Sequence, residues 1–276
     1  MINIHLGFPR TASTFIQQKI FSELSQITYL GKPYSPKIKQ VFKNYDINKF
    51  KELIFSIFRD DNFNFDKKRF KKVTFKQNKK KNIYLLSEEG LTSAIYVDPE
   101  ILAYRIKKIF GQVKLIFVIR NQLSAVESLF NQYYKKSKFS FNFNDWLLKT
   151  HRGDNEFYRS QKWILNQYDY NKYINIFERF FGKECINILL FEDLETNKKL
   201  FSDSLSNILK TNTSRTLKLI ESSNKLNQSN KFFFKSILGL NSRTKAKSIL
   251  KEIYSNGNKK ISQKYRLNLN EKGYAI

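Results

Sequence analysis

Residues 2–21 read "INIHLGFPRTASTFIQQKIF". The stretch predicts a short buried strand at 2–6 and a helix at 13–24, with Gly7 and Pro9 forming a tight turn between them. At the start of such a helix the backbone N–H groups have no intrahelical partner, and the helix dipole is positive. The turn therefore predicts an anion-binding loop at the carboxyl end of a strand.

The side chains of this loop suit an anion as well. Arg10 supplies a fixed charge with several donors, and hydroxyl groups follow at Thr11, Ser13 and Thr14. A P-loop triphosphatase requires G-x-x-x-x-G-K-[ST], with Lys directly before the hydroxyl residue. Here the basic residue stands three positions before Ser13 and Ala12 replaces the second glycine, so the spacing argues against ATP hydrolysis. A helix start that Ser13 or Thr14 caps is the structural alternative.

The rest of the chain alternates strands and helices. Further strands are expected at 82–91, 113–121 and 185–194, and helices at 98–111, 122–136 and 156–182. This order predicts an α/β fold of the P-loop type, with three layers and a central parallel sheet flanked by helices. We expect a single domain over 1–276, with a basic insertion around 32–82 and a C-terminal helical region at 222–276. Sites in such sheets lie at the carboxyl ends of the strands.

The composition indicates the cellular compartment and the kinds of partner to expect. The formal net charge is +26, and Cys185 is the single cysteine, which fits a reducing compartment. No apolar run approaches the roughly 18 to 20 residues that span a bilayer, and a strand that begins at Ile2 argues against a signal peptide, so we expect a cytoplasmic protein. The basic charge fits either a compositional drift of the proteome or attraction of an anionic cofactor, acceptor or membrane surface. Its densest run, 66–82, comes without a nucleic-acid-binding motif, which argues against a nucleic-acid partner.

A second pair of anion ligands follows the third expected strand. Residues 115–130 read "LIFVIRNQLSAVESLF". Arg120 ends the strand, and Ser128 stands eight residues later, about two turns into the next helix. Both side chains can converge on one phosphate. The alternative is an arginine that covers the sheet edge and a serine that packs within the helix.

These stretches resemble motifs of the sulfotransferases. The sequence "GFPRTAST" (7–14) is similar to their 5′-phosphosulfate loop, and the pair Arg120 and Ser128 is similar to their 3′-phosphate motif. Residues 180–195, "FFGKECINILLFEDLE", resemble a late strand of the family that leads into E-D-L. The matches span about two-thirds of the chain.

Some positions depart from that pattern or allow another interpretation. Gln122 stands where the family commonly has Pro, and Ala12 stands where Gly is usual. We expect the backbone at Ala12 to avoid the positive φ that is open to glycine. In a Walker-B-like alternative, Glu192 or Asp193 would hold magnesium, whereas in the sulfotransferase interpretation both are structural.

The resemblance implies a bacterial, carbohydrate-type sulfotransferase that depends on 3′-phosphoadenosine 5′-phosphosulfate (PAPS) and releases 3′,5′-adenosine bisphosphate. The residues that it assigns to this cofactor are Pro9, Arg10, Thr11, Ala12, Ser13, Thr14, Arg120 and Ser128. It implies that Arg10 stabilises the charge on the leaving 5′ phosphate, and that no metal takes part. A basic loop at 222–231 is expected to close over the nucleotide.

The acceptor hydroxyl must lose its proton to a base. Glycan sulfotransferases often use a glutamate at the end of the second strand, where this chain reads "LLSEEG". We favour Glu89 as the base over Glu88, with His151 as a further alternative, and such a base contributes about 10²- to 10⁴-fold in rate. The other histidine, His5, lies within the first strand and is expected in the core.

The acceptor is therefore expected to be a carbohydrate or glycolipid, with peripheral contact at the inner, anionic face of the membrane as a further expectation. Two alternatives come from other classes: a P-loop kinase, and a non-enzymatic protein that binds nucleic acid or an anionic membrane.

Overall fold

The computed structural model describes residues 2–31, 57, 83–92, 98–137, 142–152, 163–222 and 240–276. The expected basic insertion around 32–82 lies outside these ranges except for Ile57, and the expected loop at 222–231 lies outside them beyond Ser222.

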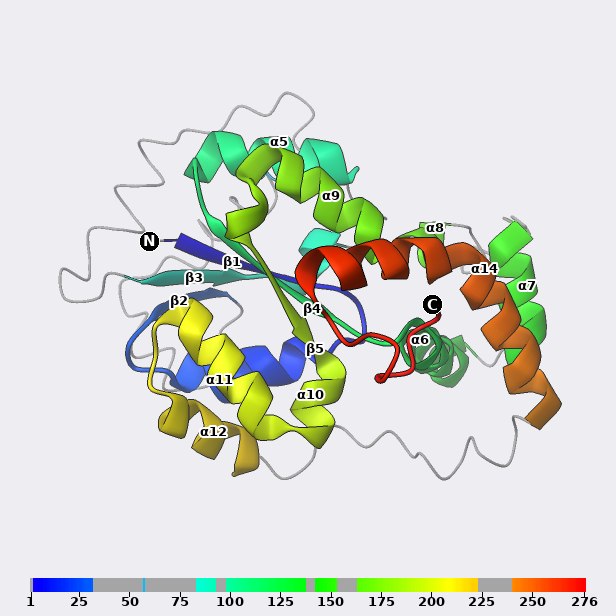
Figure 1. Ribbon diagram of the computed structural model, residues 1–276. Helices are drawn as coiled ribbons and strands as arrows, with labels where there is room; N and C mark the ends of the chain where they lie inside the picture. The colour runs from blue at the N-terminus through cyan, green and yellow to red at the C-terminus, as the bar shows by residue number, and fades with distance from the viewer. Residues whose placement is uncertain are drawn as a thin grey trace.

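A five-stranded parallel sheet organises the described chain (Figure 1). Its strands are β1 (Ile2–Gly7), β2 (Thr28–Gly31), β3 (Tyr84–Ser87), β4 (Lys114–Ile119) and β5 (Ile186–Leu190). The order is β2-β3-β1-β4-β5, so β1 lies in the middle, with the expected strands on both sides. The expected α/β fold with a central parallel sheet is confirmed. Strand β2 was not expected, because four residues ending in a glycine carry no recognisable period.

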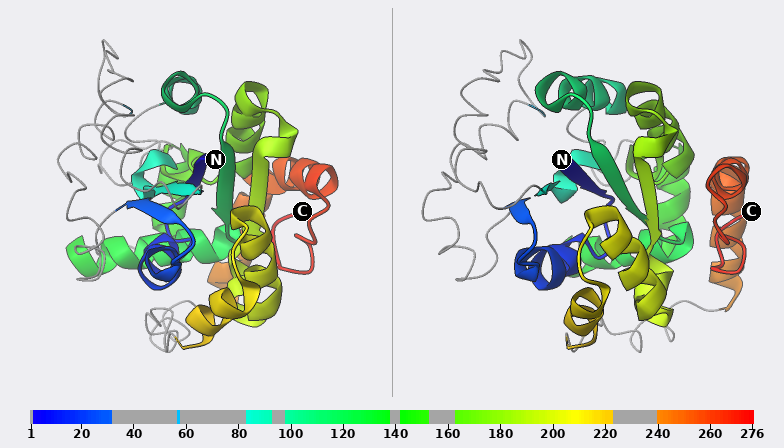
Figure 2. Two further views of the ribbon diagram at one scale, coloured as in Figure 1. Left: turned by 90° about the vertical axis from the view of Figure 1, so that its left-hand side faces the viewer. Right: turned by 60° about the vertical axis from the view of Figure 1, so that its left-hand side comes forward.

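Helices cover both faces of the sheet (Figure 2). Helices α5 (Pro99–Phe110) and α9 (Tyr170–Phe181) lie on one face, and α11 (Lys198–Leu209) lies on the other with the helical segment that follows β1. Alternation along the strands divides the core in the same way: Leu115 and Phe117 of β4 pack with the first layer, whereas Ile116 and Val118 pack with the second. The sheet is thus buried on both faces, as parallel sheets are.

The remaining helical elements are α1 (Ser13–Phe15), η1 (Ile16–Ile20), η2 (Phe21–Glu23), η3 (Glu89–Thr92), α6 (Gln122–Ser137), α7 (Phe143–Arg152), α8 (Trp163–Asn166), η4 (Lys183–Cys185), α10 (Phe191–Thr196), α12 (Thr213–Glu221) and α14 (Leu240–Tyr265). None of the helices in the part of the chain that the structure describes combines the length and the apolar character that crossing a bilayer demands.

The expected helix at 98–111 is confirmed together with its ends. The Asp98 side chain accepts a hydrogen bond from the Glu100 backbone N–H at 2.8 Å, and Gly111 ends α5 at φ 72°. The expected helix at 122–136 is confirmed as α6.

Three other boundaries were predicted wrongly. The strand expected at 82–91 ends at Ser87, and the backbone from Glu89 to Thr92 forms η3. The helix expected at 156–182 is interrupted before α9, where Asp169 accepts from the Lys172 N–H at 3.0 Å and starts a new helix. The strand expected at 185–194 ends at Leu190, and Glu192 and Asp193 lie in the first turn of α10. Acidic residues are favourable in the first turn of a helix because the helix dipole is positive at that end.

A buried polar cluster joins β1, β3 and η1. Ser87 Oγ lies 2.7 Å from His5 Nδ1 and accepts a hydrogen bond from Gln17 Nε2 at 2.9 Å. All three residues are buried, so the expectation that His5 belongs to the core is confirmed. Burial lowers the pKa of His5 to about 3, so the imidazole is neutral.

We predict that His5→Gln weakens the pH dependence of stability. The folded-state pKa lies below the unfolded value of about 6.5, so the unfolded chain binds the proton more tightly. The stabilising contribution is complete above about pH 6.5 and is lost as pH falls toward 3. Between pH 7 and pH 5, wild type should lose about 2 kcal/mol that the variant does not lose, measured by urea unfolding.

Leu6→Val is the matched control on the same strand. It shortens a core side chain without touching the imidazole, so its destabilisation should be the same at both pH values. An equal pH dependence in wild type and His5→Gln would contradict the prediction.

Candidate functional site

The loop after β1 adopts a strained backbone. Arg10 and Ala12 both have positive φ, at 66° and 64°. The expectation that Ala12 would avoid this region is wrong: its small side chain accepts the left-handed conformation, which costs an L-residue about 1 to 2 kcal/mol. The Thr11 hydroxyl stabilises the turn by donating to the Phe8 carbonyl at 2.7 Å. A Cβ at Gly7 would lie 2.0 Å from Ser13 Oγ, so only glycine permits this approach.

The helix that follows the loop begins without a side-chain cap. Ala12 occupies the N-cap position, and no side chain makes a capping hydrogen bond there. The alternative in which Ser13 or Thr14 caps the helix is therefore not what the structure shows. A helix start without a side-chain cap is a place where backbone N–H groups can bind an anion.

Three predicted site residues meet beside this helix start. Arg120, at the end of β4, donates from Nη1 to the carbonyl oxygen of Arg10 at 2.9 Å. The Arg10 side chain extends to α6, where Nε donates to Ser128 Oγ at 2.8 Å and Nη1 donates to Gln132 Oε1 at 3.4 Å. The structure thus brings the first loop and the Arg120–Ser128 pair to one place.

The side chain of Arg120 stacks on an aromatic ring, and the backbone at this residue is held by hydrogen bonds from other elements. Its guanidinium carbon lies 4.1 Å from the centroid of the Phe191 ring. The Tyr170 hydroxyl donates to the Arg120 carbonyl at 2.7 Å, and the next N–H, of Asn121, donates to Glu192 Oε1 at 2.8 Å. Backbone and side chain are therefore fixed from different elements.

Glu192 and Asp193, which follow β5, interact with hydrogen-bond donors and a lysine of the protein itself. Besides Asn121, the Tyr274 hydroxyl donates to Glu192 Oε2 at 3.0 Å, and Lys272 Nζ lies 2.5 Å from Asp193 Oδ1. Burial raises the pKa of Glu192, against the hydrogen bonds and the charge of Arg120, which lower it. These contacts favour the structural role of the pair over the magnesium-binding alternative. Across the described ranges, no three His, Cys, Asp or Glu side chains form a group that could hold a metal.

The end of β3 is tied to the first loop. The Thr92 hydroxyl donates to the Gly7 carbonyl at 2.7 Å, and the Tyr173 hydroxyl donates to the Thr92 carbonyl at 3.1 Å. Glu88 is buried and its Oε1 accepts from the Gly90 N–H at 3.2 Å. The backbone of Glu89 begins η3, directly after Glu88. The segment with both candidate carboxylates therefore lies next to the loop that follows β1.

The remaining candidate base lies elsewhere. His151 is in the last turn of α7, which packs against α6, α8 and α14 at the edge of the molecule (Figure 1). No hydrogen bond between described residues joins it to the loop. His151 is thus the candidate that the structure does not bring to the site.

Several residues of the site were not predicted from the sequence. They are Thr92, Tyr170, Tyr173, Gln132 and Tyr274. Each acts through a contact with a residue far along the chain, and no local pattern marked Thr92, Tyr170, Tyr173 or Tyr274. The one usable signal was Gln132, which stands one helical turn after Ser128 on the same face of α6.

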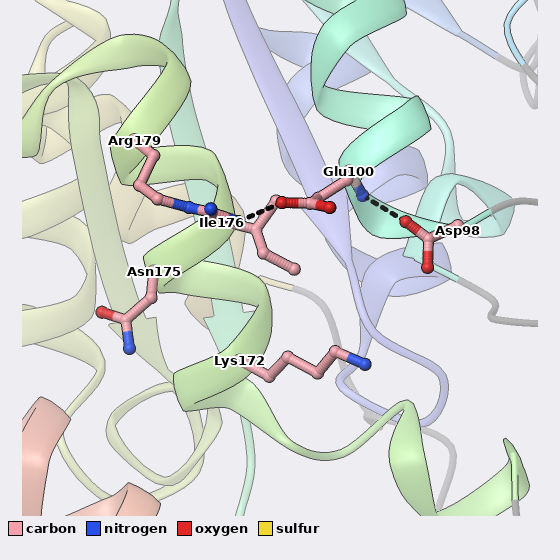
Figure 3. A pocket seen from close by; sticks show the side chains of 6 residues that line it. All are labelled: Asp98, Glu100, Lys172, Asn175, Ile176 and Arg179. Carbon is pink, nitrogen blue, oxygen red and sulfur yellow. Dashed lines mark hydrogen bonds and ion pairs between the residues drawn. The ribbon is translucent and has the colours of Figure 1, made fainter.

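A separate hollow of about 390 Å³ lies between the outer surfaces of α5 and α9 (Figure 3). It is lined by Asp98, Glu100, Lys172, Asn175, Ile176 and Arg179. Arg179 pairs with Glu100, but both side chains are more than half exposed, so the pair contributes little to stability. None of the predicted site residues lines this hollow.

The structure is similar to solved sulfotransferases. The chain matches a sulfotransferase from Alicyclobacillus acidocaldarius with a TM-score of 0.60 and 11% sequence identity, over 99% of this chain and 98% of that one. A mouse sulfotransferase complexed with PAP gives a TM-score of 0.49 at 14% identity, covering 91% of this chain and 83% of that one. A sulfotransferase domain from the curacin biosynthetic pathway also gives 0.49, at 16% identity and with 90% and 96% covered. No family model and no curated protein matches the sequence. The chain therefore has the fold of a sulfotransferase.

We predict that Ala12→Gly stabilises the protein. Glycine has no Cβ penalty at φ 64°, so the free energy of unfolding should rise by about 1 kcal/mol in a denaturant titration. Ala125→Gly, in the interior of α6, is the control and should lower it by about 1 kcal/mol or more. A loss of stability in both variants would show that Ala12 is not held in the left-handed conformation.

Proposed function

We propose that the protein is a sulfotransferase that moves a sulfuryl group from PAPS to an acceptor hydroxyl. The observation that carries this proposal is the junction of Arg120, Arg10 and Ser128 beside an uncapped helix start. It offers two neighbouring sets of anion ligands on adjacent strands of the sulfotransferase fold. A donor with a 5′ phosphosulfate and a 3′ phosphate requires two such sets.

The loop residues 9–14 would hold the 5′ phosphosulfate, and Arg120 with Ser128 would hold the 3′ phosphate. In-line attack by the acceptor oxygen moves negative charge onto the oxygen that bridges sulfur and the 5′ phosphate. The helix N–H groups and Arg10 are suited to stabilise that charge. Ser128 and Gln132 orient Arg10 for this role from α6.

A carboxylate after β3 would remove the acceptor proton. One oxygen of Glu88 already accepts from the Gly90 N–H, which supports a role for Glu88 in shaping η3. Glu89 is therefore the favoured base, with Glu88 second and His151 third. The proposed carbohydrate or glycolipid acceptor rests on this carboxylate, and proposed contact with an anionic membrane surface from the cytoplasm rests on the charge of +26.

The test of the donor is a thermal-shift comparison. We expect 3′,5′-adenosine bisphosphate to raise Tm, and ATP with magnesium or an oligonucleotide to have little effect. A larger shift with ATP and magnesium would favour the P-loop kinase, and a larger shift with the oligonucleotide would favour a nucleic-acid-binding protein. A sulfuryl-transfer assay with PAPS and a panel of glycans then tests the activity and its acceptor.

Arg120→Ala should weaken 3′,5′-adenosine bisphosphate selectively. A charge-assisted hydrogen bond contributes roughly 1.5 to 3 kcal/mol, so its Kd should rise about tenfold or more in calorimetry. The Kd of adenosine 5′-phosphosulfate, which lacks the 3′ phosphate, should barely change. The control is Arg179→Ala, at an exposed arginine of α9. Equal losses for both nucleotides would mean that Arg120 acts through the Arg10 carbonyl and not on the 3′ phosphate.

Glu89→Gln should abolish turnover and leave nucleotide affinity nearly unchanged. Glutamine keeps the shape of the side chain and loses its basicity, so kcat should fall about 100-fold or more. Glu88→Gln is the matched control and should cost less activity, with some loss of stability because Glu88 is buried. An inactive Glu88→Gln with an active Glu89→Gln would move the base by one residue.

A further inference from the structure

The segment after α14 folds back onto the carboxyl edge of the sheet. Figure 1 shows it, in red, returning from the end of α14 toward α6. Local hydrogen bonds shape it: the Leu267 N–H donates to the Ser262 carbonyl at 2.9 Å, and the Tyr274 N–H donates to the Leu269 carbonyl at 3.1 Å. Leu269 and Tyr274 are buried, so the segment is packed and not merely laid on the surface. We refer to residues 266–276 as the strap.

The strap contacts the residues directly after Arg120. The Asn121 side-chain amide donates to the Gly273 carbonyl. One residue further, Gln122 and Asn258 of α14 are paired, with Gln122 Nε2 donating to Asn258 Oδ1 at 2.9 Å. Asn258 in turn donates to the Ala275 carbonyl at 2.8 Å. The first turn of α6 is therefore held by α14 and the strap together.

One carboxylate links the strap to the backbone of the anion site. Glu192 accepts from the Tyr274 hydroxyl on Oε2 and from the Asn121 N–H on Oε1. Asn121 shares its peptide group with Arg120, whose carbonyl also accepts from Tyr170. Glu192 follows Phe191, the ring on which the Arg120 guanidinium stacks. The tyrosine, the carboxylate and the arginine thus form one continuous set of contacts.

The charges in this set depend on each other. The Glu192 carboxylate is largely buried next to Arg120, and two protein donors satisfy its oxygens. If the Tyr274 hydroxyl is removed, one carboxylate oxygen loses its donor, and its negative charge is then directed more strongly at Arg120. An anion that binds Arg120 would compete with that charge.

We propose that Tyr274 and Glu192 are positioning residues for Arg120, and that docking of the strap is coupled to anion binding at that arginine. The proposal rests on the proposed function of the site only for the identity of the anion, a 3′ phosphate. Coupling between two sites is reciprocal, so the anion stabilises the docked strap as much as the strap favours the anion.

Tyr274→Phe tests the proposal, and Tyr265→Phe is its matched control. Tyr265 also donates to a glutamate, with its hydroxyl 2.7 Å from Glu178 Oε2, but this pair lies on α9 and α14 away from Arg120. We expect Tyr274→Phe to raise the Kd of 3′,5′-adenosine bisphosphate about five- to tenfold, the effect of one hydrogen bond. The Kd of adenosine 5′-phosphosulfate should not change, and Tyr265→Phe should bind both nucleotides like wild type.

Hydrogen exchange supplies a readout that needs no nucleotide. In the free protein, Tyr274→Phe should speed exchange of the Asn121 amide, and Tyr265→Phe should not. In wild type, 3′,5′-adenosine bisphosphate should slow exchange across 266–276. Unchanged Asn121 exchange, unchanged nucleotide binding in Tyr274→Phe, or an equal effect in Tyr265→Phe would overturn the proposal. If wild type binds neither nucleotide, the proposed function fails, and Asn121 exchange alone decides whether the strap positions Arg120.

Discussion

The hydrogen bond from Arg120 to the carbonyl oxygen of Arg10 joins the two strand ends on which the site is built. It exists because β1 and β4 are parallel neighbours, with Gly7 opposite Val118, so both chains leave the sheet at the same edge. The positive φ of Arg10 is part of this loop geometry. A strained backbone persists only where its surroundings hold it, and here the hydrogen bond from Thr11 to Phe8 within the loop acts together with the contact from Arg120.

Both arginines of the candidate site are held by partners from other elements. Arg10 donates to the neutral oxygens of Ser128 and Gln132, and the Arg120 guanidinium stacks on the Phe191 ring. The nearby carboxylate, Glu192, accepts hydrogen bonds from the Asn121 N–H and the Tyr274 hydroxyl. Positive charge is thereby concentrated at the edge of the sheet, where an uncapped helix start adds to it.

Local patterns predicted most of the sheet and three residues that the structure brings into contact at the candidate site, Arg10, Arg120 and Ser128. Helix α5 carries its own cap and stop, and the spacing from Arg120 to Ser128 is contained in one strand and one helix. Strand β2 is too short to show a period. The break before α9 was missed because aromatic residues, Tyr168 and Tyr170, continue through it, and the cap at Asp169 decides the boundary. Tyr274 lies 82 residues from Glu192, so only folding brings the two together.

The departure from the sulfotransferase pattern at Gln122 also has its reason in a contact between residues far apart in the sequence. At the position where the family commonly has Pro, the side chain of Gln122 is buried and bonded to Asn258, which Pro could not do. A buried amide pair contributes only when both partners are present, because either one alone would leave unsatisfied polar groups. The start of α6 in this chain therefore depends on α14, and the order of the proposed anion site depends on a part of the chain more than 130 residues away.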